Sequence, residues 1–217
     1  MAWNWFKKIA KEYPKFWENY LNYFENEPNE TKPKRYVVFD CETTGLHFRN
    51  DVILSIGAVV VIDHSVVVND HIELYLKQDI YKSETAVIHG LLKEGKEEKI
   101  VEAEAIIRFL EFIKDSTLVG HHVSFDIEMI NQALKKLDVG KLKNDSMDTD
   151  AMYQKFKGLQ EDQHSSLDEL CKALKVQKSD RHTASGDAFI TALLFLKLKS
   201  RLKIYFFTLT TKLKTEP

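Results

Sequence analysis

Short apolar runs rich in β-branched residues recur along the central part of this chain and predict strands. The four clearest runs cover residues 36–39, 52–62, 66–76 and 117–120, and a weaker one covers 146–149. Asp63-His64-Ser65 predicts a tight turn between the second and third runs. We therefore expect the first three strands to form an antiparallel meander.

Apolar residues at spacings of three and four predict helices in the rest of this region. The expected helices cover residues 83–90, 99–114, the segment directly after the strand at 117–120, and residues 150–156, 167–174 and 183–199. Three strands therefore come first, and helices then alternate with the strand at 117–120 and the weak edge strand at 146–149. This order predicts an α/β fold with a mixed sheet flanked by helices.

Residues 1–30 form a separate aromatic segment. Its apolar residues recur at helical spacing and are Trp3, Phe6, Ile9, Tyr13, Phe16, Trp17, Tyr20, Leu21 and Phe24, with Pro14 breaking or kinking the helix. The helix either packs on its own domain or offers a docking face to a partner protein. A polar stretch with prolines follows it, so we divide the chain into an N-terminal helical extension and linker (1–34), a main domain (35–200) and a basic tail (201–217).

The net charge of −2 over 217 residues hides an uneven distribution. Residues 36–196 carry 27 acidic and 18 basic side chains, while the flanking segments are basic. An acidic centre argues against a broad basic groove for nucleic acid and suits a site that collects metal ions. Cys41 and Cys171 lack the spacing of a metal or redox site, and no long apolar run predicts a membrane span or signal peptide. We expect a cytoplasmic protein with reduced thiols.

Two carboxylates interrupt the end of the first predicted strand. Asp40 and Glu42 lie at positions i and i+2, so an extended backbone projects both from the same face. Such a pair repels itself and is costly to bury, which favours a divalent cation between the two side chains. The alternative is a strand end that carries two solvated acids.

Three further residues fit a shared site with this pair. Asp126 begins a helix just after a strand, where the helix dipole favours a carboxylate. Asp187 lies on the otherwise apolar face of the last predicted helix and therefore needs a partner. His182 precedes it by five residues, close enough for both side chains to reach one site.

Three segments resemble the motifs of the DEDDh group of 3′–5′ exonucleases, which includes the proofreading epsilon subunit of bacterial DNA polymerase III. They are Phe39-Asp40-Cys41-Glu42-Thr43-Thr44-Gly45, Ser124-Phe125-Asp126 and His182-Thr183-Ala184-Ser185-Gly186-Asp187-Ala188. Each motif is weak alone, but all three occur in order and in the expected structural context. The resemblance covers roughly residues 35–199.

The resemblance implies a ribonuclease-H-like fold and a site for two divalent ions, Mg²⁺ or Mn²⁺. By position, Asp40 would bridge the ions, Glu42 and Asp187 would complete the binding of one, and Asp126 would hold the other through water. His182 would act as the general base that takes a proton from water. The expected reaction is 3′–5′ hydrolysis of single-stranded or frayed DNA ends. An RNA-directed exoribonuclease and an idle nucleic-acid-binding subunit are the alternatives.

The resemblance also suggests residues that contact the substrate. The expected contacts to the terminal nucleotide are Thr43, Thr44, Gly45, Leu46, His89, His122 and Phe125. His122 stands where the family usually has Asn, and an imidazole is bulkier than an amide and titratable. The expected partners are a single-stranded 3′ end, DNA more than RNA, and a polymerase or other protein bound through the N-terminal aromatic helix. No membrane partner is expected.

Overall fold

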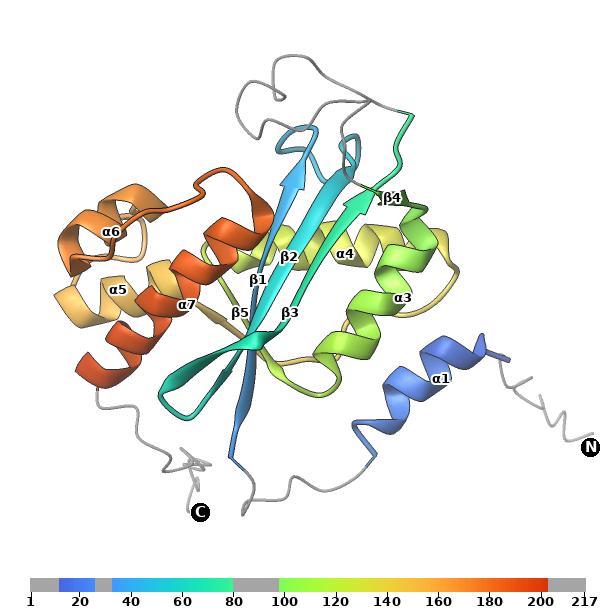
Figure 1. The fold of residues 1–217 in the computed structure, drawn as a ribbon, viewed down its shortest axis with the longest axis horizontal. Coiled ribbons are helices and arrows are strands. Elements are labelled where there is room, and N and C mark those ends of the chain that lie inside the picture. The colour runs from blue at the N-terminus through green and yellow to red at the C-terminus, as the bar shows by residue number, and fades with distance from the viewer. Residues whose placement is uncertain (1–11, 26–32, 80–97, 203–217) are drawn as a thin grey trace, which may run out of the picture.

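A six-stranded mixed sheet forms the centre of the computed structural model, which describes residues 12–25, 33–79 and 98–202 (Figure 1). The strands are β1 (Arg35–Thr43), β2 (Ile53–Ile62), β3 (Ser65–Leu76), β4 (Lys99–Ile100), β5 (Thr117–Gly120) and β6 (Ser146–Asp148). They lie in the order β4-β3-β2-β1-β5-β6. β1, β2 and β3 form the predicted antiparallel meander, while β5 and β6 run parallel to β1.

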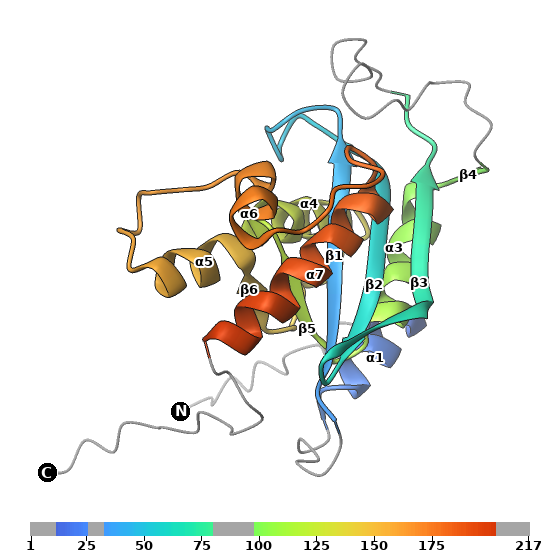
Figure 2. The same ribbon diagram turned by 60° about the vertical axis from the view of Figure 1, so that its left-hand side comes forward.

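Helices cover both faces of this sheet (Figure 2). The helices are α1 (Lys15–Asn22), α3 (Glu102–Ile113) and α4 (Val123–Lys136) on one face, and α5 (Thr149–Lys157), α6 (Leu167–Leu174) and α7 (Ala184–Arg201) on the other. Alternating residues of β1 enter the two cores: Val37 and Phe39 pack with α3 and α4, whereas Val38 packs with α7. Asp40 and Glu42 continue the alternation of Val38, so their side chains face α7.

A glycine in β2 allows α7 to approach the sheet closely. Gly57 pairs directly with Asp40 across the β1–β2 ladder. A Cβ at Gly57 would lie 2.2 Å from the backbone carbon of Ala184, at the beginning of α7. Ser185, the next residue of α7, donates a hydrogen bond to Glu73 of β3 at 2.5 Å. The start of α7 is therefore seated on the sheet beside Asp40.

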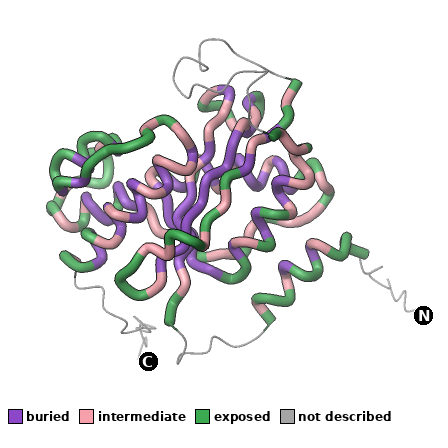
Figure 3. Tube along the Cα trace, in the orientation of Figure 1, coloured by how far each residue is buried: buried purple, intermediate pink, exposed green. Residues whose placement is uncertain are grey.

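The N-terminal helix α1 packs on its own domain, which was the first of the two alternatives for this aromatic segment. Trp17 and Tyr20 are both 1% exposed and belong to the core that α3 and α4 share. Buried and exposed positions occur along the same helix (Figure 3). The hydroxyl of Tyr20 donates to Asn144 at 2.6 Å and accepts from the backbone N–H of Lys143 at 2.7 Å. The burial and these bonds fix the helix against the loop that precedes β6.

The predicted mixed α/β fold is confirmed, and most predicted elements lie within one or two residues of their observed bounds. One expectation was wrong: residues 99 and 100 form the short strand β4, parallel to β3, instead of the first turn of a helix. The predicted helix over 83–90, which includes His89, lies outside the described residues. So do residues 1–11 of the extension and 203–217 of the tail, while α7 continues to Arg201. No helix in the described ranges is both long enough and apolar enough to cross a membrane.

Candidate active site

Three carboxylates converge where the end of β1 meets the start of α7. One ligand oxygen each from Asp40, Glu42 and Asp187 lies within 4.8 Å of the other two. Asp187 is in the first turn of α7, where the side chain of Thr183 caps the helix by accepting from the N–H of Gly186 at 3.1 Å. Two strand residues and one helix residue that lies 145 or more positions after them in sequence thus form one acidic group.

Asp126 approaches the end of β1 from the other face of the sheet. It lies in the first turn of α4, is 5% exposed and accepts a hydrogen bond from the backbone N–H of Cys41 at 3.1 Å. Its charge contributes to the raised pKa of Asp40, so the two carboxylates sense one another. Asp126 is not one of the three acids whose oxygens lie within 4.8 Å, and it adjoins that group from the α4 side.

Burial and nearby negative charge raise the pKa of Asp40, Glu42 and Asp126. Burial first, and then Asp126, Glu42 and Asp187, raise the pKa of Asp40 well above its usual range. Burial and the charge of Asp187 raise the pKa of Glu42 to about 7. Burial raises the pKa of Asp126 to about 8, against hydrogen bonds from Cys41 and from its own backbone that lower it. A cation among these acids would replace the protons.

The residues fit a hard divalent cation. The Oδ1 atom of Asp187 is buried and has no hydrogen-bond partner among the described residues. Nothing there offsets the cost of removing this anionic oxygen from water. All donors in this group are carboxylate oxygens, the ligands that Mg²⁺ and Mn²⁺ prefer. Asp40, Glu42, Asp187 and, from the α4 side, Asp126 are the residues that would hold such ions.

Arg181 is a residue of this site that the sequence analysis missed. Its guanidinium donates through Nη1 to Oδ2 of Asp187, and through Nε to Oδ1 of Asp168 at 3.0 Å. It supplies the partner that an inward Asp187 requires. The only feature of the sequence that could have pointed to Arg181 is its position next to His182. Its bond to Asp187 crosses the turn before α7, so no helical spacing predicts the contact.

His182 lies in the turn immediately before α7, as predicted. Its backbone is left-handed, with φ of 65°, and its side chain is exposed. Within the described part of the chain, the ring makes no hydrogen bond or ion pair with the acids. The ring is therefore accessible to solvent.

Hydrogen bonds among its own residues stabilise the loop after β1. Thr44 is fully buried, donates to Oδ1 of Asp51 at 2.8 Å and accepts from the N–H of Val52 at 3.0 Å. Gly45 fits tightly against Asp51, because a Cβ there would lie 2.6 Å from Oδ2. The hydroxyl of Thr43 donates to the carbonyl of Gly45 at 2.8 Å. The side chain of Thr44 therefore supports the loop, and its contact with a substrate would be through the backbone.

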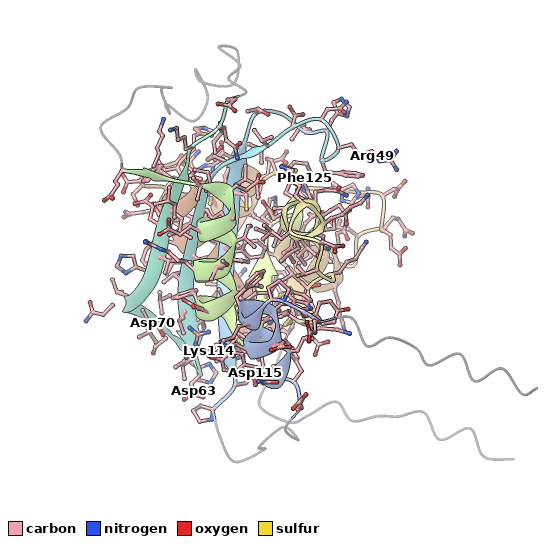
Figure 4. The ribbon with its side chains drawn as sticks, turned by 90° about the vertical axis from the view of Figure 1, so that its right-hand side faces the viewer. Arg49, Asp63, Asp70, Lys114, Asp115 and Phe125 are labelled. Atoms are coloured by element: carbon pink, nitrogen blue, oxygen red, sulfur yellow. The ribbon has the colours of Figure 1, made fainter. Side chains whose placement is uncertain are left out.

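Two of the residues predicted to contact the substrate have apolar side chains, and they lie in the loop after β1 and at the start of α4. Leu46 is 81% exposed, which is unusual for so large an apolar residue. Phe125 is half-buried at the start of α4 and packs partly against the core (Figure 4). Leu46 is thus available to a ligand from its loop, and Phe125 offers only part of its ring.

His122 lies in a different group from the four acids. It precedes α4 with a left-handed φ of 57°, and its Nδ1 is 3.7 Å from Oδ2 of Asp150. His164 approaches the same oxygen. The sequence analysis did not single out Asp150, and nothing in its spacing from His122 or His164 indicated that the three residues meet.

Comparisons with known proteins identify the family to which most of this chain is similar. The family model described as Exonuclease matches residues 37–195. A PolC-type DNA polymerase III of Caldanaerobacter subterraneus subsp. tengcongensis is 33% identical over 177 residues, which cover 77% of this chain and 12% of the relative. The DNA polymerase III subunit epsilon of Salmonella typhimurium is also 33% identical over 177 residues, covering 76% of this chain and 71% of the relative. The chain thus spans a small part of the PolC-type protein.

A solved structure confirms the predicted ribonuclease-H-like fold. The zinc-bound complex of E. coli exonuclease I with single-stranded DNA superposes with a TM-score of 0.69 at 20% identity, covering 80% of this chain and 42% of that one. At 20% identity this structure shows a likeness of fold alone, and the family assignment rests on the sequence matches. The chain therefore belongs to the exonuclease family, and its matched domain is homologous to the DNA polymerase III epsilon and PolC-type proteins.

Proposed function

We propose that this chain is a metal-dependent 3′–5′ exonuclease that releases mononucleotides from single-stranded or frayed DNA ends. The observation that carries the proposal is the meeting of Asp40, Glu42 and Asp187 at one point, with Asp126 adjoining them and a buried oxygen of Asp187 left unpaired. An acidic group of this kind repels a phosphodiester unless cations are bound to it. The function therefore requires divalent metal.

In this proposal the four acids hold two divalent ions, Mg²⁺ or Mn²⁺. When bound, such ions activate water and stabilise the charge that develops on the leaving oxygen of a phosphodiester. His182 takes the proton from the attacking water, since its exposed ring lies in the turn that leads into Asp187. Arg181 then keeps its bond to Asp168 and can release Asp187 to a metal ion.

The substrate proposal rests on the exposed apolar loop. Leu46 can pack against the terminal base or sugar, and Phe125 bounds the same end of the site. Apolar contacts of this kind tolerate any base and favour an unpaired end. The E. coli exonuclease I to which this fold is similar was solved as a complex with single-stranded DNA, which supports the same choice of substrate here.

The setting of this activity is part of the same proposal. The epsilon relative is a polymerase subunit by name, so a polymerase is the partner class we propose for this chain. Cys41 and Cys171 are free and buried, which fits a reducing cytoplasm. Because Trp17 and Tyr20 are buried in the domain core, a docking partner would have to use other residues of the N-terminal segment.

The deciding experiment compares 5′-labelled single-stranded DNA and RNA of one sequence, each with a free or a blocked 3′ end. We expect stepwise shortening of DNA with a free 3′ end in Mg²⁺ or Mn²⁺. Blocking the 3′ end should stop it. RNA cleaved at least about ten times faster than DNA would favour the exoribonuclease alternative. Tight binding without cleavage in any metal would favour an idle binding subunit.

A further inference from the structure

We propose that His122, Asp150 and His164 form a second metal site, separate from the acidic group and suited to a zinc-class transition metal ion. One ligand atom from each residue lies within 4.8 Å of the other two. Nδ1 of His164 is 2.8 Å from Oδ2 of Asp150, and Nδ1 of His122 is 3.7 Å from the same oxygen. The three residues come from the turn before α4, the first turn of α5 and the loop before α6.

The donor set distinguishes this site from the acidic group. Two imidazole nitrogens and one carboxylate oxygen are ligands that Zn²⁺ accepts in tetrahedral sites with a fourth position open to water. An all-carboxylate group instead favours Mg²⁺ or Mn²⁺. Ligand bonds of about 2.0–2.1 Å imply tetrahedral ligand separations of roughly 3.3 Å. The separations of 2.8 Å and 3.7 Å lie on either side of this value, so small side-chain shifts would suffice.

The carboxylate at the centre of the group is buried and held in place. Asp150 is 2% exposed, and its Oδ1 accepts from the N–H of Ser165 at 3.0 Å. That bond leaves Oδ2 facing both histidines. Hydrogen bonds that orient a ligating carboxylate in this way are typical of protein metal sites.

The backbone that carries His122 and Asp150 is held by a second carboxylate. Asp148 accepts hydrogen bonds from the N–H groups of Val123 at 2.8 Å, Asp150 at 2.8 Å and His122 at 3.3 Å. One side chain therefore ties together the turn before α4 and the start of α5. Little backbone motion is then needed for His122 and Asp150 to bind an ion.

Solvent reaches the group from the histidine side. The side chains of His122 and His164 are 47% and 64% exposed, whereas that of Asp150 is 3% exposed. An ion from solution can therefore enter between the two rings and meet the buried carboxylate. Bound there, it would join the loop before α6 to the start of α4, one turn from Asp126.

The same three residues also permit a simpler arrangement, in which Asp150 pairs with a protonated histidine. The two arrangements differ in what they bind. A built metal site binds Zn²⁺ tightly through all three residues and releases protons when it does so, whereas an ion pair would bind the ion only weakly. Zinc binding therefore decides between them.

The test uses the untagged full chain with Asp40→Asn and Asp187→Asn, so that the acidic group no longer competes for zinc. Zn²⁺ is titrated against a chromophoric chelator, and Co²⁺ is added separately while visible absorption is recorded. We expect one equivalent of Zn²⁺ and the strong Co²⁺ bands of a four-coordinate site. In the same background, His164→Ala should weaken zinc binding by at least about 10–100-fold.

His64→Ala is the matched control, because His64 is exposed in the turn between β2 and β3. It should leave zinc affinity unchanged. Thermal unfolding in chelator checks that each variant is folded, and Asp150→Asn gives a second loss-of-ligand variant. Zn²⁺ should raise the melting temperature of the Asp40→Asn, Asp187→Asn parent protein, and it should not raise that of the parent that also carries His164→Ala. Equal zinc affinity in the parent, His164→Ala and Asp150→Asn would overturn the proposal, whatever the nuclease activity of the native chain.

Discussion

At the scale of single residues, we propose different tasks for His182 and Asp187, although they are only five positions apart. His182 is exposed and makes no hydrogen bond within the described residues, so replacing it leaves the acidic group intact. We expect His182→Ala to lower turnover by about 10²–10⁴, the usual contribution of a positioned general base. Mn²⁺ affinity, measured by calorimetry, should stay within a few-fold of wild type. A variant that cleaves at the wild-type rate would exclude His182 as the base.

Arg181 provides a second prediction at this scale. It is the cation that Asp187 contacts, and their side chains are 19% and 10% exposed. Arg181→Gln should lower the free energy of unfolding in chelator by about 2–3 kcal/mol, because a nearly buried carboxylate loses a charged hydrogen bond. Mg²⁺ should recover part of this loss. Urea unfolding with and without Mg²⁺ measures both effects, and an unchanged midpoint in chelator would show that the pair contributes nothing.

At the scale of elements, the site depends on how closely α7 approaches β2. Gly57→Ala places a Cβ where the backbone of Ala184 lies, so the start of α7 must shift. We expect a loss of about 1–3 kcal/mol in stability from the overpacking. Mn²⁺ affinity should fall as well, because Asp187 moves away from Asp40. Val68→Ala, at a site 62% exposed on β3, is the control for both measurements. Unaltered Mn²⁺ binding in Gly57→Ala would contradict this role for α7.

The elements also show what the sequence could and could not reveal. Asp40, Glu42, Asp126 and Asp187 could be predicted because each lies in a short motif with a local strand or helix context. The strand β4 has two residues, and its place is set by pairing with Tyr75 and Leu76 of β3. The bond from Arg181 to Asp187 depends on the conformation of the turn before α7, and the meeting of His122 with Asp150 depends on tertiary packing. Local periodicity carries no information about such contacts.

At the scale of the whole molecule, the acids make the metal-free protein sensitive to pH. The pKa is raised to about 7 for Glu42 and to about 8 for Asp126, against about 4 for unfolded carboxyls. Between pH 5 and 8 the folded state therefore binds more protons than the unfolded state, and stability falls as pH rises. In chelator the melting temperature should drop across this range.

Two comparisons test the origin of that drop. Asp126→Asn removes one group with a raised pKa and should make the melting temperature fall less steeply. Mg²⁺ should also reduce the drop, because it binds the ionised acids of the folded state. A melting temperature in chelator that rises steadily from pH 5 to pH 8 would contradict the raised pKa values.

The proposed activity of the whole molecule is cleavage of DNA from the 3′ end by the acidic group at the end of β1, with metal bound. It is tested by following a 5′-labelled single-stranded DNA with wild type, Asp187→Asn and Asp63→Asn in Mg²⁺, Mn²⁺ and chelator. Asp63 is exposed in the turn between β2 and β3, at the opposite end of the molecule from Phe125 (Figure 4). We predict a ladder of products one nucleotide apart for wild type and Asp63→Asn with metal. We predict no ladder with chelator and at least about a 100-fold loss for Asp187→Asn. Equal cleavage by wild type and Asp187→Asn, or cleavage that persists in chelator, would contradict the proposed mechanism.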